Sequence, residues 1–295
     1  MKKIVTYLLA TLMLFSAFAQ KQPKRDKAVI KTEKNLVGQF VYIPAGHFSI
    51  SENLPSKITE PKTEATVSAF YMLETEVTNW AYNAFLEDLK AQGRTADYEK
   101  ARIRSENWLT SKHYDVAAKD YFDNHPAYQH YPVVNVPYEG AVMFCEWLTA
   151  KIGNSEWEYM LPTRAEWMWA AHGGNEGADF NIYSMGPFLT DSQGKPCYAY
   201  LHIGDESITM ADSTYQVADN VVRYLSTPCP AKCFYANAYG LYNMCGNVAE
   251  MVSEQGVAVG GSWQDPGYDI RIASKKTYTE PTQQIGFRVM AKKVK

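Results

Sequence analysis

Apolar residues recur at helical spacing in three stretches of the chain. One is Asn79–Lys90, preceded by Thr78, whose hydroxyl is suited to cap a helix N-terminus. A second apolar face runs through residues 141–148. Before the third stretch, Thr163 and Glu166 have the spacing of a capping box, in which each side chain satisfies the backbone N–H of the other. The pattern therefore predicts three short helices with defined starts.

The strand pattern consists of short segments separated by turns. Phe40–Ile50 reads as strand, Pro-x-Gly turn and strand, and Ala65–Glu74 alternates apolar and polar residues like a half-buried strand. Glycines break up an aromatic-rich background over Asn237–Arg288, which favours short strands and tight turns. Asn175–Tyr235 contains no long periodic segment. Because no internal boundary is visible, we predict one domain over residues 40–293.

Residues 1–19 read as a secretory signal peptide. Lys2 and Lys3 precede an apolar run, and Ala17–Ala19 forms an A-x-A-like cleavage site. A membrane anchor is the alternative, but the apolar run is short for a span of ~20 residues. Residues 20–39 are polar and mostly basic, and we predict that they form a linker. The chain is therefore expected to be exported and periplasmic, with outer-membrane association as a further option.

Charge and cysteine content narrow the function classes. The formal net charge is −3, and no basic stripe interleaves with the aromatic residues, which argues against a nucleic-acid partner. Of the 5 cysteines, Cys229 and Cys233 are predicted to form a local disulfide. A zinc site is the alternative, and it would need a second ligand pair. Cys145 falls on an apolar helical face and is predicted to be buried.

Two stretches carry candidate metal chemistry. Asn243, Asn247 and Glu250 lie among glycines, and their side-chain oxygens could surround a hard cation; capping of turns without any ion is the alternative. Residues 91–130 hold several histidines and aspartates whose spacing matches no compact metal motif, so we expect a solvated, partly ordered insertion there. These side chains are His113, Asp115, Asp120, Asp123, His125 and His130.

Seven short motifs follow one another along the chain. They lie at Phe40–Phe48, Glu76–Asn79, Tyr131–Val136 with Phe144–Trp147, Leu161–Trp167, Gly240–Val248, Gly260–Trp263 and Gly286–Arg288. In this order they resemble the formylglycine-generating-enzyme (sulfatase-modifying-factor) family. The resemblance covers nearly the whole chain after residue 39, and it implies an α+β fold related to the C-type lectin domain, with a few short helices and short antiparallel strands.

The resemblance also implies a structural calcium site. The family's ligands correspond to the Asn243 side chain, the Gly246 and Val248 carbonyls and the Glu250 carboxylate. Four protein oxygens with waters would complete a coordination number of ~6–8. The family's other calcium site uses an Asn-Ile pair, and Tyr200–Leu201 stands there in this chain.

The family's catalytic chemistry is not expected here. Catalytic members bind copper through two cysteines that follow Gly-Gly-Ser, and those positions are Asp265 and Ile270 in this chain. Neither side chain supplies the sulfur that soft Cu(I) requires. The family's usual Trp-Glu-Trp is replaced by Ala249–Met251. Iron-dependent relatives carry a His-rich helical domain in front, where this chain has only a short basic segment. We therefore expect no catalytic residue, no copper and no iron.

Two further segment pairs resemble the non-catalytic lipoproteins of gliding motility and type IX secretion. They are His125–Tyr128 with Tyr131–Val134, and Gly260–Pro266 with Ile285–Arg288. Those lipoproteins use the fold as a building block under the outer membrane, which implies protein partners in a periplasmic or outer-membrane-associated assembly. The lipid-modified cysteine of that branch is absent here, because the first cysteine is Cys145.

Three functions follow from these patterns. The first is an exported, non-catalytic scaffold or binding protein. The second is a divergent metal-dependent oxidoreductase with ligands drawn from Trp108–His130. The third is a calcium-dependent binder of glycan or peptide, suggested by the lectin-like fold and the many tyrosines and tryptophans.

Overall fold

The computed structural model describes residues 22, 24–50, 63–108, 116–153, 156–174, 228–233, 235–265 and 269–294. The predicted signal peptide, Cys197, the Tyr200–Leu201 pair, His113 and Asp115 lie outside the described residues. Within these residues, no helix is both long enough and apolar enough to span a bilayer.

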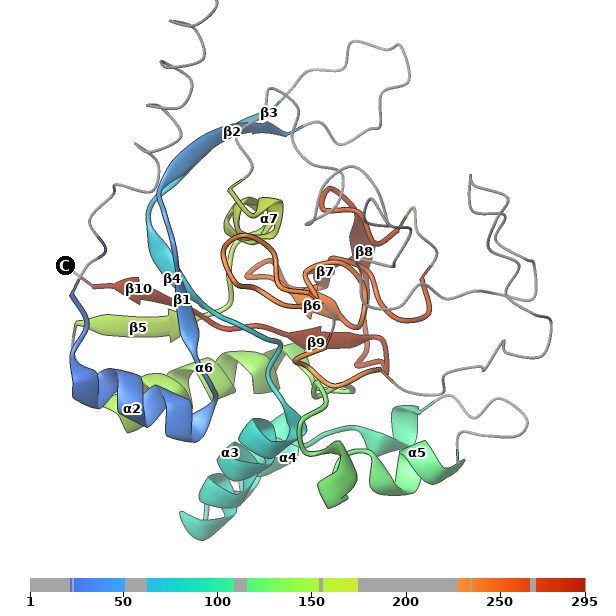
Figure 1. Ribbon diagram of the computed structural model, residues 1–295. Coiled ribbons are helices and arrows are strands. Elements are labelled where there is room, and N and C mark those ends of the chain that lie inside the picture. Colours follow the sequence, from blue (N-terminus) through green and yellow to red (C-terminus); the bar gives the residue numbers. More distant parts are fainter. Residues whose placement is uncertain are drawn as a thin grey trace, which may run out of the picture.

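A four-stranded antiparallel sheet joins the two ends of the domain. Its strands are β1 (Phe40–Ile43), β4 (Phe70–Leu73), β10 (Met290–Lys293) and β5 (Trp157–Met160), in that spatial order. Met290 of β10 lies opposite both Met72 and Met160, so the C-terminal strand is an inner strand of the sheet (Figure 1). The sheet is therefore complete only when β10 is paired between β4 and β5.

A second four-stranded sheet is built from the glycine-rich C-terminal part. Its spatial order is β8 (Lys275–Thr277), β7 (Val257–Val259), β6 (Ala249–Met251) and β9 (Ile285–Phe287). β6 pairs with β9 in parallel, and the other pairings are antiparallel. The predicted short strands and tight turns of this region are confirmed.

The predicted strand over residues 65–74 is two strands in different sheets. β3 (Thr63–Val67) pairs with β2 (Gly46–Ile50), whereas β4 pairs with β1 and β10. Every residue of β4 is buried. A strand covered on both faces cannot show the alternation that a half-buried strand shows, so the predicted pattern is wrong for β4.

The three predicted helices are confirmed. They are α3 (Asn79–Ala91), α6 (Tyr138–Ile152) and α7 (Arg164–His172). Thr78 Oγ1 accepts a hydrogen bond from the Ala81 N–H, and Thr163 and Glu166 form the complete capping box. α6 and α7 both end at a glycine in the left-handed conformation, as is usual for a helix C-terminus.

The predicted basic linker is wrong for residues 25–39. Residues Lys27–Leu36 form helix α2, which packs beside α6 (Figure 1). The guanidinium of Arg25 lies 4.5 Å from the Tyr71 ring and 4.8 Å from the Trp157 ring. It also pairs with the buried carboxylate of Glu33. The basic composition of the segment predicts exposure to solvent. Aromatic rings from distant strands nevertheless cover one side of it, because they pack against Arg25.

The insertion after α3 is more ordered and more buried than predicted. It contains α4 (Thr95–Ala101), the 3-10 turn η1 (Ser105–Asn107), α5 (Val116–Tyr121) and the 3-10 turn η2 (Pro126–Tyr128). Trp108 and Phe122 are almost fully buried, and their ring centroids are 5.0 Å apart. These rings pack with Trp263 of the C-terminal region, so the insertion is part of the core.

The remaining core lies on the two sides of the first sheet. On one side, the rings of Tyr82, Phe144 and Phe287 pack with centroids 5.5 to 5.9 Å apart, which joins α3 and α6 to β9. On the other side, α7 buries Trp167 and Met168 against the second sheet. The segments between these layers carry the polar site.

Candidate functional site

Three charged side chains from distant parts of the chain meet inside the protein. Glu76 lies between β4 and α3, Glu250 lies in β6, and Arg288 follows β9. Each is at most 1% exposed. Burial of charged groups is unfavourable unless they are paired and hydrogen-bonded, so their partners decide what the cluster can do.

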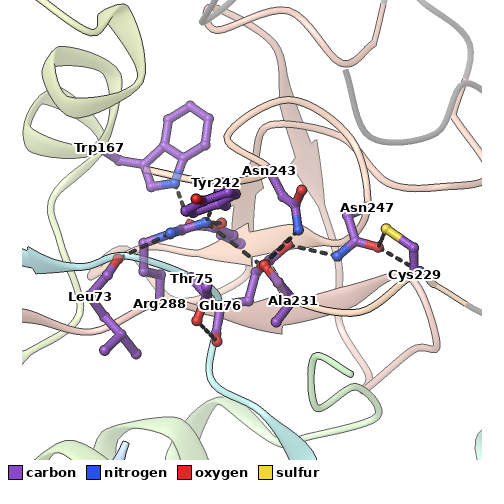
Figure 2. A network of polar contacts seen from close by, with 11 residues as sticks. Leu73, Thr75, Glu76, Trp167, Cys229, Ala231, Tyr242, Asn243, Asn247 and Arg288 are labelled. Atoms are coloured by element: carbon purple, nitrogen blue, oxygen red, sulfur yellow. Dashed lines mark hydrogen bonds and ion pairs between the residues drawn. The ribbon is translucent and has the colours of Figure 1, made fainter. Parts of the chain in front are cut away.

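Arg288 and Glu250 form a closely matched ion pair. Arg288 Nη2 is 2.6 Å from Glu250 Oε1, and Arg288 Nε is 3.0 Å from each carboxylate oxygen. Trp167 Nε1 donates to Glu250 Oε2 at 2.6 Å. Arg288 also donates to the carbonyls of Leu73 and Tyr242, at 3.1 and 2.7 Å (Figure 2). The guanidinium thus links both sheets through charge-assisted hydrogen bonds.

Glu76 has no such partner of its own. Its Oε2 lies 3.9 Å from Arg288, whose short contacts go to Glu250. Burial raises the pKa of Glu76 to about 8, the negative charge of Glu250 acts in the same direction, and Arg288 opposes both. The raised pKa favours the protonated carboxyl at neutral pH, and in that state the cluster holds one positive and one negative charge.

Two asparagines of the glycine-rich loop hold Glu76 in place. Asn247 Nδ2 donates to Glu76 Oε1 at 2.9 Å, and Asn243 Nδ2 donates to Oε2 at 3.3 Å (Figure 2). Both asparagines have positive φ, 55° for Asn243 and 62° for Asn247. Asparagine tolerates this conformation better than most residues. The same loop brings Cys229 to the network, because Asn247 Oδ1 accepts from the Cys229 N–H at 2.9 Å and from its thiol at 3.3 Å.

The residues assigned to calcium meet the needs of an ion only in part. Among the described residues, none donates a hydrogen bond to the buried Asn243 Oδ1, so this oxygen suits a ligand role. Glu250, in contrast, has both carboxylate oxygens engaged by Arg288 and Trp167. A hard cation needs that carboxylate to balance its charge. As placed, the Glu250 carboxylate does not fit a calcium ion, and the site formed by Asn243, Gly246, Val248 and Glu250 stays a prediction.

At the two positions assigned to copper-binding cysteines, the structure places an ion pair and an apolar side chain. Asp265 Oδ1 is 2.7 Å from Lys276 Nζ, while its Oδ2 accepts from the Ser262 N–H at 2.8 Å and the Ser262 hydroxyl at 2.6 Å. Ile270 is fully buried. An ammonium group and a carboxylate that is already paired do not offer a site for a soft cation.

Close backbone packing holds the Gly-Gly-Ser loop against the segment that carries Ile270. Gly261 has φ 64°, and a Cβ placed on it would lie 2.7 Å from the Asp269 carbonyl oxygen. Only glycine allows the Gly-Gly-Ser loop to approach this segment so closely. Lys276, which lies in β8, also donates to Gln284 Oε1 at 2.6 Å. The Asp265–Lys276 ion pair is therefore held by β8 and by the segment before β9.

The histidines and aspartates of the insertion face different partners. His125 Nδ1 accepts from the Ala127 N–H at 3.1 Å and caps η2, and His130 Nε2 lies 3.0 Å from Gln129 Nε2. Asp123 is buried beside the Ser105 hydroxyl, and burial raises its pKa to about 6. In the part of the chain that the structure describes, no three or more His, Cys, Asp or Glu side chains are grouped to hold a metal ion.

The cysteine predictions have different outcomes. Cys145 is buried in α6, as predicted. Cys229 and Cys233 are free thiols, so the predicted local disulfide is not formed in this structure. The two side chains nevertheless interact, since Cys233 contributes to the raised pKa of Cys229.

The sequence motifs contain Glu76 and Arg288, but nothing in them indicates that the two residues meet in one cluster. Arg288 carries one signal, because it is the only charged residue in the run Ile285–Ala291. Arginine is rarely fully buried without a partner, so an arginine inside an apolar strand pattern predicts a buried carboxylate elsewhere. Nothing in the sequence says which carboxylate that is.

Comparison with known proteins identifies the family. The sulfatase-modifying factor enzyme 1-like domain matches residues 26–293. The formylglycine-generating enzyme of Mus musculus is 26% identical over 241 residues, which cover 73% of this chain and 58% of that enzyme. The inactive C-alpha-formylglycine-generating enzyme 2 of the same organism is 25% identical over 253 residues, covering 79% of this chain and 71% of that protein.

Solved structures share the fold. CarF aligns with a TM-score of 0.59 and 22% identity over 87% of this chain and 98% of CarF. PvdO from Pseudomonas aeruginosa aligns with a TM-score of 0.54 and 21% identity, over 86% of this chain and 94% of PvdO. The predicted α+β fold of this type is confirmed. A match that begins at residue 26 also includes helix α2 in the domain. The chain therefore belongs to the sulfatase-modifying factor enzyme 1-like family.

Proposed function

We propose that this chain is an exported, non-catalytic scaffold or binding protein that keeps the architecture of the formylglycine-generating-enzyme family without its oxidase chemistry. The observation that carries the proposal is the Asp265–Lys276 ion pair, with Oδ1 and Nζ 2.7 Å apart, at a position where the family resemblance places a copper thiolate. Ile270 occupies the second such position and is fully buried.

The buried cluster of Glu76, Glu250 and Arg288 supports a structural role for the motifs that remain. Its strongest contacts are internal, and they connect β4, β6, α7 and the residue after β9. Preservation of such a cluster maintains the fold whether or not a reaction takes place nearby. The mouse relative whose name describes it as inactive is consistent with a family in which fold and activity are separable.

For the partner, we propose a protein of a periplasmic or outer-membrane-associated assembly of the gliding-motility and type IX secretion kind. The support is the likeness of residues 125–134 and 260–288 to lipoproteins of that branch. Trp80, Tyr121 and Tyr235 are 41%, 55% and 56% exposed. Exposed aromatic residues are enriched at protein interfaces, so these three are our first candidates for partner contacts.

One purified sample can test the proposed lack of oxidase chemistry. The purified chain is analysed for bound metals, and its oxygen consumption is followed with a thiol-containing peptide as substrate. We expect no stoichiometric copper or iron and no turnover. Stoichiometric redox metal together with thiol-dependent oxygen consumption would instead support the divergent oxidoreductase.

The partner is sought by cross-linking and affinity capture from a periplasmic extract. The wild type is compared with a variant in which Trp80, Tyr121 and Tyr235 are all alanine. We expect a defined protein partner that the variant fails to retain. A glycan array with a calcium-dependent signal, without a captured protein, would favour the lectin-like alternative.

A further inference from the structure

Two thiols lie at the edge of the buried polar network. Cys229 is 7% exposed, and its thiol donates to Asn247 Oδ1 at 3.3 Å. The Cys233 side chain is half-buried, and its interaction with the Cys229 thiol contributes to the raised pKa of Cys229. Both thiols are free, and only three residues separate them along the chain.

Contacts to three other segments hold the turn between the cysteines. The Ala231 N–H donates to the His130 carbonyl at 2.9 Å, and the Ala231 carbonyl accepts from Asn243 Nδ2 at 2.9 Å. Lys232 Nζ lies 3.1 Å from Glu74 Oε2. Because the turn is already ordered, closing a disulfide requires little further loss of chain entropy.

The two thiols differ in accessibility. Burial raises the pKa of Cys229, so that thiol stays protonated at neutral pH. Cys233 is the more accessible sulfur. In thiol–disulfide exchange the accessible thiolate attacks first, and a neighbouring thiol then resolves the mixed disulfide. The arrangement matches that division, with Cys233 as the attacking residue and Cys229 as the resolving residue.

We propose that Cys229 and Cys233 are a reversible dithiol–disulfide pair that exchanges with small-molecule disulfides. The Cys233 thiolate attacks one sulfur of the small disulfide and displaces the first thiolate. Cys229 then loses its proton to solvent and attacks the Cys233 sulfur, which releases the second thiolate. The protein gives up two electrons and two protons in all, and the small disulfide becomes two thiols.

Oxidation changes the hydrogen bonding of the network. A disulfide has no S–H, so Asn247 Oδ1 loses the thiol donor and keeps only the Cys229 N–H. Asn247 is also the residue that donates to Glu76. Formation of the disulfide therefore changes the hydrogen bonding of the loop that holds Glu76.

The first test measures the cysteines directly. The full chain is equilibrated in glutathione buffers of increasing oxidised fraction, alkylated, digested and analysed by mass spectrometry. We expect a Cys229–Cys233 cross-link that forms in oxidising buffer and disappears in reducing buffer. Cys145→Ala should leave it unchanged, Cys233→Ser should abolish it, and Cys229→Ala should leave one glutathione on Cys233. A wild-type pair that stays reduced throughout, or that bonds to other cysteines, overturns the proposal.

The second test addresses the link to Asn247. Amide hydrogen exchange of the peptide over residues 243–250 is compared between the reduced and oxidised wild-type chain. Loss of one hydrogen bond should speed its exchange by about five-fold. Equal exchange in the two states would overturn the link, and a peptide from α3 serves as the internal control.

Discussion

Arg288 and Glu250 form a fully buried ion pair, in which Nη2 and Oε1 are 2.6 Å apart and Nε is 3.0 Å from each carboxylate oxygen. Arg288 is 0% exposed, and Glu250 is 1% exposed. The pair lies where two sheets and helix α7 meet, so its loss affects all three. The arrangement also bears on Glu76: burial raises the pKa of that carboxyl, and Arg288, whose short contacts go to Glu250, offsets this only in part.

Substitution of Arg288 should destabilise the fold strongly. In Arg288→Met the Glu250 carboxylate remains buried without its counter-ion, and removal of one partner of a buried pair costs about 3–5 kcal/mol. The free energy of unfolding is measured by urea denaturation. Lys293→Met is the matched control, since Lys293 is 55% exposed and its pair with Glu156 is 3.8 Å long. A loss below about 1 kcal/mol for Arg288→Met would contradict this account.

The stability of the chain should fall as pH rises from about 5 to about 8. The pKa of Glu76 is raised from an ordinary 4.5 to about 8, so between these values the folded state binds one proton more than the unfolded state. The unfolding free energy then decreases by about 1 kcal/mol per pH unit and levels off above pH 8. Glu76→Gln should remove this slope, whereas the exposed Glu87→Gln should keep it. Equal slopes in the two variants would count against a protonated Glu76.

Asp265 should matter for stability rather than for catalysis. Asp265→Ala removes the acceptor of the Ser262 N–H and hydroxyl and of Lys276 Nζ, and we expect a loss of about 2 kcal/mol. Asp97→Ala removes a surface pair with Arg94 and should cost about 0.5 kcal/mol. Thermal and urea unfolding report both values. An Asp265→Ala chain as stable as the wild type would show that the ion pair does not hold the loop.

Arg25 should anchor the N-terminal helix. Arg25→Ala removes contacts to the Tyr71 and Trp157 rings and leaves Glu33 buried without its cation. We expect a loss of about 2–3 kcal/mol and faster protease cleavage within residues 25–39. Lys31→Ala, at an exposed position of α2, is the control. Cleavage at the same rate in both variants would restore the linker interpretation of this segment.

Calcium should have little effect on the folded chain. Because Arg288 and Trp167 engage the Glu250 carboxylate, we expect the melting temperature to be the same with a chelator and with millimolar calcium. A ligand that binds only the folded state raises the melting temperature with concentration. A rise of that kind, abolished by Asn243→Ala, would support the calcium prediction and would require Glu250 to share its partners.

Local features of this protein were readable from the sequence. Helix starts at Thr78 and Thr163 follow from hydroxyl groups that accept a hydrogen bond from an N–H three residues later. The turns of the C-terminal region follow from glycines that allow positive φ. The order of short motifs was sufficient to indicate the family fold. The helix starts and the turns depend on contacts within a few residues.

The pairing of charges was decided only by the tertiary structure. Glu76 approaches residues about 170 positions away, Arg288 pairs with Glu250 across 38 residues, and Arg25 enters a group of aromatic rings from several strands. Sequence by itself determined which segments could form helices, strands and turns, because those depend on backbone geometry and neighbouring side chains. Burial and distance decide which carboxylate pairs with Arg288 and which carboxyl has its pKa raised. Both quantities are defined only after the segments have packed.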